Sequence, residues 1–95
     1  MSNVDEVISL ISKESNQDGA DFTEYDLNGA SIEGASFVYA TFDKAKLENS
    51  TLTGINFTQA SFQGSSLKNS KLTDIDFTGA KLAGVNFEEA VFVNC

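Results

Sequence analysis

The sequence contains no His, no Trp and no Arg, and its single Cys is the last residue, Cys95. Without His, the abundant Ser and Thr hydroxyls lack the usual general base that activates a nucleophile. A lone Cys allows no disulfide within the chain and argues against a zinc site. We therefore expect a protein that is not an enzyme and that binds no cofactor or metal.

Positive charge is also scarce. Six Lys face 14 acidic residues, so the formal net charge is -8. Direct nucleic-acid binding needs clustered Lys and Arg, so we do not expect it; a basic protein partner suits this charge better. No apolar run reaches membrane-spanning length, and Asp5 and Glu6 replace the basic start of a secretory signal. We expect a cytoplasmic protein with no membrane contact.

A repeat of five residues runs through most of the sequence. An apolar residue recurs at every fifth position, which we call the fifth-residue row and expect to form the core. Its members are Phe22, Leu27, Ile32, Phe37, Phe42, Leu47, Leu52, Phe57, Phe62, Leu67, Leu72, Phe77, Leu82, Phe87 and Phe92. The residue two positions earlier is mostly small, and the residue two positions later is Gly or Asn nine times in fifteen. Gly and Asn there indicate a type II turn, whose second corner needs positive φ.

A twenty-residue period lies on top of the first. Sorted by it, the row falls into four columns of similar residues, such as Phe37, Phe57 and Phe77, and Ala20, Ala40, Ala60 and Ala80 share a further column. Four pentapeptides would then complete one coil, and successive coils would stack about 4.8 Å apart, like hydrogen-bonded strands.

These repeats resemble the pentapeptide repeat proteins, whose consensus is Ala-(Asp/Asn)-Leu-x-x with Leu or Phe at the centre. The clearest matches are Ala20-Asp21-Phe22, Ala30-Ser31-Ile32, Ala40-Thr41-Phe42 and Ala80-Lys81-Leu82. The resemblance implies an all-β solenoid, a right-handed quadrilateral β-helix of about four coils over residues 19–95. Tyr25, Ile55, Ile75 and Val85 replace the small residue of the consensus, which leaves the local turn types open.

Residues 1–18 precede the repeats and predict a short capping α-helix and a linker. Val4, Val7, Ile8 and Ile11 have the spacing of one helix face. The helix is either a lid over the exposed end of the solenoid or an element for a partner or a membrane surface. We favour the lid because terminal repeats need a cap.

The ends of this helix also carry sequence signals. Ser2 with Asp5 resembles a capping box, and Asn3 is an alternative cap. Gly19 suits a left-handed residue at the helix exit.

Two places are candidate contact sites. Val91 and Val93 occupy outward positions that are mostly polar elsewhere, so Val91, Phe92, Val93 and Cys95 predict a homodimer through C-terminal ends. The alternatives are a frayed end or a piece of a longer tube. Val38 and Tyr39 form an exposed apolar spot on the wall. The pairs Asp74 with Asp76 and Glu88 with Glu89 are interpreted as surface charge, since neither recurs at the coil period.

The resemblance also frames function. Most members of the family have no known biochemical role, and many are bacterial, particularly cyanobacterial. Some members resemble B-DNA in shape and charge; they bind DNA gyrase and thereby protect the gyrase from quinolones. We expect a non-catalytic, rigid acidic interaction or scaffold module with an unknown protein partner; the alternative is a DNA mimic that binds gyrase or topoisomerase.

Overall fold

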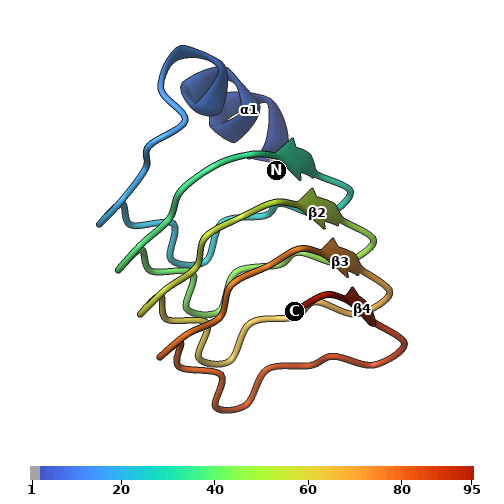
Figure 1. Ribbon diagram of the computed structural model, residues 1–95. Helices are drawn as coiled ribbons and strands as arrows, with labels where there is room; N and C mark the ends of the chain where they lie inside the picture. The colour runs from blue at the N-terminus through green and yellow to red at the C-terminus, as the bar shows by residue number, and fades with distance from the viewer. Residues whose placement is uncertain (1–2) are drawn as a thin grey trace.

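The computed structural model describes residues 3–95, and the chain winds as a four-sided, right-handed β-helix. Parallel bridges join residues that are twenty apart, for example Asp21 with Thr41. One face carries short strands, β1 (Ser31–Glu33), β2 (Thr51–Thr53), β3 (Lys71–Thr73) and β4 (Val91–Val93). They form one parallel sheet in chain order, one strand per coil (Figure 1). The predicted coil of four pentapeptides is confirmed.

Every corner places one residue in the left-handed region. The position two residues after each member of the row has positive φ from Glu24 to Asn94, whether or not that residue is Gly, and Gly19 has it as well. At three corners of each coil a backbone bond closes the turn, as in Ala40 N–H to Phe37 O at 3.0 Å. This geometry is that of a type II turn. Within residues 3–95 the corners after β1, β2 and β3 are not closed this way, and they are where the larger Ile55 and Ile75 are buried.

The core is one side chain deep and is built from the columns. Phenylalanine rings of one column stack on each other, as Phe42 does on Phe62 with centroids 5.0 Å apart. Rings of neighbouring columns meet edge to face, as Phe57 and Phe62 do at 4.8 Å. Both arrangements are favourable for aromatic quadrupoles, so the two phenylalanine columns hold successive coils in one register.

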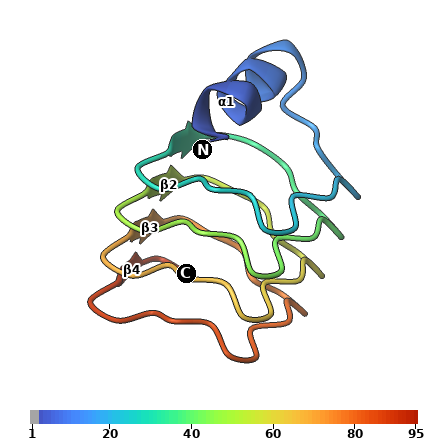
Figure 2. The same cartoon turned by 180° about the vertical axis from the view of Figure 1, so that it is seen from behind.

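The expectation that the whole row is core is wrong for the last coil. Phe77, Leu82 and Phe87 are only partly buried, and Phe92 is 46% exposed. The reason is geometric, because each core side chain is enclosed by the coils on both sides of it. No described coil lies beyond residues 76–95 (Figure 2).

Helix α1 (Val4–Lys13) covers the other end of the tube (Figures 1 and 2). Val7 is fully buried, and Ile8 and Ile11 pack against the first coil. Tyr25, one of the departures from the consensus, donates a hydrogen bond to Glu6 on α1, and this contact raises the pKa of Tyr25 above its ordinary value. The apolar face of α1 is thus packed against the solenoid, and the predicted lid is confirmed.

The predicted helix ends need two corrections. Ser2 lies outside the described residues, and Asn3 is the N-cap by position but makes no capping hydrogen bond with its side chain. Asn3 pairs instead with Asp26: its N–H donates to Asp26 O at 2.7 Å, and its Oδ1 accepts from Asp26 N–H at 2.8 Å. These bonds replace those that a preceding coil would supply.

The run from Ser15 to Gly19 was predicted as the exit of the helix, with Gly19 as its left-handed cap, and the cap prediction is wrong. The helix ends at Lys13, and an extended Glu14 is its C-cap. Gly19 has positive φ because it forms the first corner of the solenoid. Parallel pairing begins at Asn16 with Ser36, so residues 15–19 are a first repeat with Gln17 in place of the apolar residue.

Candidate functional site

The side chains that point away from the core form the wall of the tube, and many of them hold its turns. Asp21, Asn56 and Asp76 stand directly before a row residue, and each Oδ1 accepts the backbone N–H two residues later. The hydroxyl of a Thr at that later position donates to the same oxygen. These bonds hold the pKa of Asp21 and Asp76 below the ordinary value. The side chain of Asp or Asn at this position therefore forms an Asx turn with the backbone two residues later.

Other wall side chains connect one coil to the next. Asp18, Asn28 and Asp43 stand directly after a row position, and each accepts a backbone N–H twenty residues further on at 2.8–3.0 Å. The wall is therefore held together by side chains as well as by the backbone ladder.

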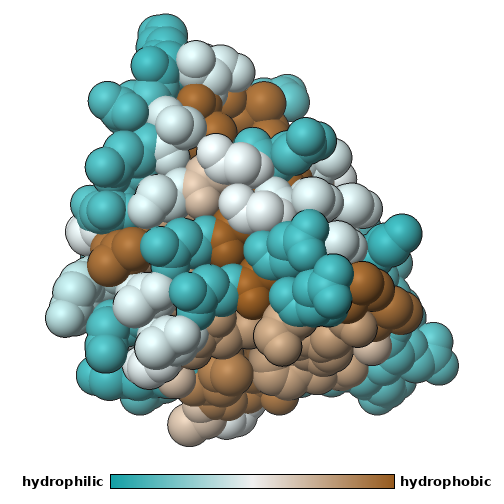
Figure 3. All heavy atoms as spheres, viewed as in Figure 1, coloured by the Kyte–Doolittle hydropathy of each residue, from teal (hydrophilic) through white to brown (hydrophobic). Residues whose placement is uncertain are grey.

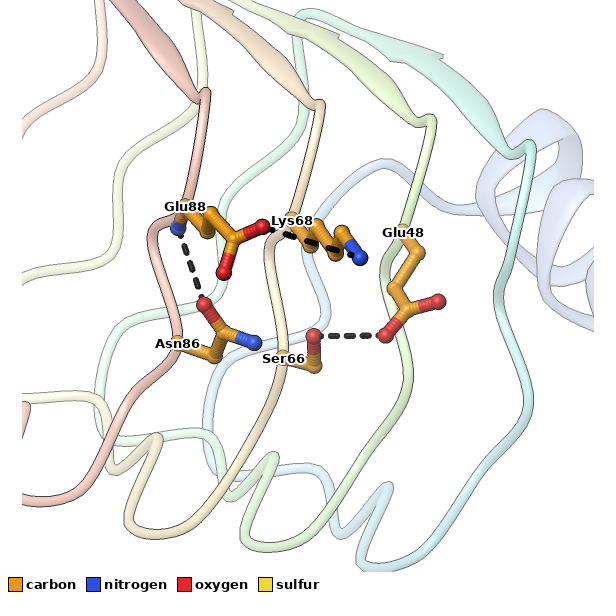
Figure 4. A network of polar contacts seen from close by, with 5 residues as sticks. All are labelled: Glu48, Ser66, Lys68, Asn86 and Glu88. Atoms are coloured by element: carbon orange, nitrogen blue, oxygen red, sulfur yellow. Dashed lines mark hydrogen bonds and ion pairs between the residues drawn. The ribbon is translucent and has the colours of Figure 1, made fainter.

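Figure 4 shows a polar network on the face that follows Leu27, Leu47, Leu67 and Phe87. The Ser66 hydroxyl donates to Glu48 Oε2 at 2.8 Å, which joins two adjacent coils. Lys68 Nζ lies 3.8 Å from Glu88 Oε1, and Glu88 N–H donates to Asn86 Oδ1 at 2.9 Å. Acidic and basic groups alternate along this face, so it does not form a continuous negative stripe.

The wall provides little for chemistry. Over residues 3–95, no group of three His, Cys, Asp or Glu side chains is arranged to hold a metal ion. One oxygen of Asp76 accepts hydrogen bonds from Thr78, and Glu88 pairs with Lys68, so one member of each acidic pair weighed from the sequence is engaged in a contact of its own. No helix in the described part of the chain is long and apolar enough to cross a membrane.

The two residues of the candidate wall contact differ in their exposure. Tyr39 is 68% exposed and stands at a corner with φ +61°, whereas Val38 is only partly exposed. Val38 N–H donates to Asp18 Oδ1, which ties its backbone to the preceding coil. Tyr39 is the exposed member of the pair and therefore the one available to a partner.

The candidate residues at the C-terminal end lie together on the last coil. Val91 is 53%, Phe92 46% and Val93 40% exposed, and Cys95 is exposed beside them. In Figure 3 apolar surface gathers over the lower part of the molecule, which the last coils form. The half-buried Phe77, Leu82 and Phe87 also belong to this end and were not predicted as site residues. Their place as the last members of their columns was the signal that could have found them.

An open hollow lies at the same end of the molecule. It is lined by Asp74, Ile75, Asp76, Phe77, Thr78, Asn94 and Cys95. The Cys95 thiol lies 3.3 Å from Leu72 O, so a weak hydrogen bond holds it against β3. The lining of the hollow includes no His and one thiol, that of Cys95.

The chain is similar to known proteins in its repeat sequence and in its fold. The family description "Pentapeptide repeat region" matches residues 20–95. No curated protein sequence matches. Among solved structures, QnrB1, a plasmid-mediated fluoroquinolone resistance protein, is 23% identical with a TM-score of 0.77. That alignment covers 83% of this chain and 42% of QnrB1.

Two cyanobacterial structures are also similar. HetL, a pentapeptide repeat protein involved in heterocyst differentiation regulation in Nostoc, is 26% identical with a TM-score of 0.54; the match covers 79% of this chain and 37% of HetL. A further pentapeptide repeat protein from Nostoc is 23% identical with a TM-score of 0.53, over 90% of this chain and 75% of that one. The chain spans about two fifths of QnrB1 and HetL, and the likeness to QnrB1 shows the fold alone. The repeat, the coil geometry and the family match agree that this chain belongs to the pentapeptide repeat proteins.

Proposed function

We propose that this protein is a non-catalytic interaction module, a rigid acidic rod that binds a partner protein through its wall. The observation that carries the proposal is Tyr39. A bulky residue at positive φ costs roughly 1–2 kcal/mol of backbone energy. At 68% exposure Tyr39 recovers little of that cost by burial. Every corner of the tube has this positive φ, so the large exposed ring, and not the strain, distinguishes Tyr39 from the other corner residues.

Tyrosine is suited to that role. It supplies a large contact area with few rotatable bonds and a hydroxyl that can hydrogen-bond, and it is enriched at the centres of protein interfaces. Around it the wall is mostly polar, and the net charge of the chain is -8. The partner surface that suits this arrangement has a pocket for an aromatic ring and a basic surround.

The test is affinity capture from a lysate of the source organism with the wild-type chain and with Tyr39→Gly. Glycine is compatible with φ +61°, so the fold is kept while the ring is removed. Glu24→Gly is the matched control, because Glu24 is also a non-glycine corner at φ +61°. The proposal expects a partner that is lost with Tyr39→Gly and retained with Glu24→Gly. Equal capture by all three chains would exclude Tyr39 as the contact.

A second candidate function is DNA mimicry directed at gyrase or topoisomerase. It is favoured by the net charge of -8 together with the similarity in fold to QnrB1. Lys44, Lys46, Lys68, Lys71 and Lys81 lie among the acidic residues and interrupt any continuous negative stripe, which weakens this candidate. A gyrase supercoiling assay separates the two functions. Inhibition or protection at micromolar protein would favour mimicry, and no effect would remove it.

A further inference from the structure

The edge of β1 that faces away from β2 carries unpaired backbone groups. On β2, Thr51 N–H donates to Ala30 O at 2.9 Å, and Thr53 O accepts a backbone N–H at 2.9 Å, so both residues pair with the preceding coil. Ser31 and Glu33 occupy the same two positions one coil earlier, so their N–H and C=O groups point in the same direction, away from β2. In the described part of the chain, no hydrogen bond reaches these four groups.

The two neighbouring faces of the same coil have their edges occupied by this chain itself. Before β1, Asn3 donates to Asp26 O and accepts from Asp26 N–H. After β1, Ser36 N–H donates to Ser15 O at 2.9 Å, and Ser36 O accepts from Gln17 N–H at 2.8 Å. Helix α1 joins these two contacts across the end of the tube (Figure 1), and it supplies no strand to β1 between them. β1 is therefore the face on which the lid leaves a strand position open.

A groove of about 280 Å³ lies between α1 and this edge. Its lining consists of Ile8, Ile11 and Ser12 of α1, Ser15 after the helix, and all three residues of β1. Ile8 and Ile11 are partly exposed, whereas Ile32 is 4% exposed. The groove thus combines apolar side chains with a row of free backbone groups, and this is the arrangement that binds an extended peptide by strand addition.

The charge around the groove selects the kind of peptide. Glu33 is exposed at its rim, and the chain as a whole has a net charge of -8. We propose that the groove binds an extended segment of a partner protein, with an apolar residue flanked by Lys or Arg, that pairs in parallel with β1. The apolar residue lies opposite Ile32 and points toward Ile8 and Ile11, and the next residue lies beside Glu33, where a cation is favoured. This site is separate from Tyr39 on the wall.

Parallel pairing repeats the pattern that joins all four strands of the sheet, and it fixes which peptide groups bond to β1. The apolar residue is the central one: its N–H donates to Ser31 O, and its C=O accepts from Glu33 N–H. The C=O two residues earlier accepts from Ser31 N–H, and the N–H two residues later donates to Glu33 O. The two residues next to the central one point their backbone groups away from β1. The strand thus takes the place of a preceding coil.

The first experiment titrates the full, ¹⁵N-labelled chain with the acetylated and amidated peptide Thr-Lys-Leu-Lys-Thr and follows the amide signals by NMR. The signals of Ser31 and Glu33 should shift and saturate. N-methylation of the Leu removes the N–H that donates to Ser31 O and should weaken binding about tenfold. N-methylation of the second Lys, whose N–H points away from β1, should leave the affinity unchanged.

The two methylated peptides have the same charge and composition, so attraction to an acidic protein cannot separate them. Binding of the unmodified peptide should weaken as salt rises from about 0.05 to 0.5 M, because salt screens the attraction. No saturation by about 1 mM peptide would overturn the site. Equal affinity of the two methylated peptides, or a greater loss with methylated Lys, would overturn the parallel pairing.

The second experiment changes the protein. Ser31→Pro removes the N–H at the open edge, and Pro is tolerated as the first residue of an edge strand. It should weaken peptide binding about tenfold, whereas the matched control Ser31→Ala keeps the N–H and should bind as the wild type does. Glu33→Lys should also weaken binding, most strongly at low salt. Circular dichroism checks that each variant is folded.

Tyr39→Gly separates this site from the proposed wall contact. It should bind the peptide as the wild type does, because Tyr39 does not line the groove. Peptide binding that is lost with Tyr39→Gly and kept with Ser31→Pro would overturn the assignment to β1.

Discussion

Replacing Phe57 by Ala probes the centre of the core. Phe57 is 2% exposed and contacts four rings: it stacks on Phe37 and Phe77 at 5.5 and 5.6 Å and meets Phe42 and Phe62 edge to face at 5.6 and 4.8 Å. A buried Phe→Ala change costs about 3–5 kcal/mol. Because both neighbouring coils are fixed by their own hydrogen bonds, they cannot collapse into the gap. We expect the upper end of that range, about 4–5 kcal/mol.

Phe92→Ala is the matched comparison, because it removes the same side chain from the last coil. Phe92 is 46% exposed and has one ring contact, with Phe87. Less than a full side chain is withdrawn from water there, so the expected cost is about 1–2 kcal/mol. The two variants should therefore differ by about 3 kcal/mol, which is large against a total stability of about 5–15 kcal/mol.

Guanidinium chloride unfolding followed by far-UV circular dichroism measures this difference. With an m-value of about 3 kcal/mol/M, the midpoint of Phe57→Ala should fall about 1 M below that of Phe92→Ala. Low micromolar protein keeps self-association from contributing to the Phe92 result. Equal midpoints for the two variants would refute the inference that enclosure by two coils sets the energy of each row residue. A changed m-value would indicate that coils unfold separately, as solenoid repeats can.

Three further predictions test the corners, the lid and the buried hydroxyls. Tyr39→Gly should raise the free energy of unfolding by about 1 kcal/mol, because glycine adopts φ +61° without strain; thermal unfolding checks this, and a destabilised variant would contradict it. The hydrogen bond to Glu6 raises the pKa of Tyr25, so it stabilises the lid fully below about pH 10 and is lost as pH rises through the raised pKa. In a Tyr39→Phe background, ultraviolet titration should show that Glu6→Gln lowers the pKa of Tyr25, and an unchanged titration would show that Glu6 is not the cause. Ser70→Ala should change stability by less than about 1 kcal/mol in denaturant unfolding, since the buried hydroxyl is removed without leaving a partner unsatisfied; a larger loss would show that it does more than fill an alanine position.

The sequence predicts the tube well because each repeat must meet the same physical demands. Phe37, Phe57 and Phe77 share a column because each occupies the same inward site one coil apart. Local chemistry at the entrance to the tube was less predictable. Gly19 matches both a helix exit and a solenoid corner, and only the pairing of Asn16 with Ser36 decides between them. Asn3 is a good capping residue by type, but its side-chain oxygen accepts the backbone N–H of Asp26 instead of capping the helix.

The same logic explains why the candidate sites are harder to predict than the fold. A row residue is constrained fifteen times over by the period, whereas Tyr39 occurs once and obeys no repeat. Positions directly before and after the row are also largely committed, as Asp76 is to Thr78 and Asp43 to Gln63. What the fold leaves free is the corner residue, whose side chain points to solvent and whose backbone favours Gly or Asn. A larger side chain there is a choice that the tube does not require.

Some of those corner choices are still explained by packing between coils. A Cβ added to Gly79 would overlap the side-chain amide of Gln59, so Gln59 lies over the glycine of the next coil. Lys44 does the same above Gly64, where an added Cβ would lie 3.6 Å from Cγ. Tyr39 has no glycine twenty residues later; Gln59 stands there. The ring of Tyr39 is 68% exposed and has no glycine beneath it on the next coil. Packing between coils therefore does not explain why Tyr occupies this corner. A partner-binding role therefore follows more naturally for Tyr39 than for Gln59 or Lys44.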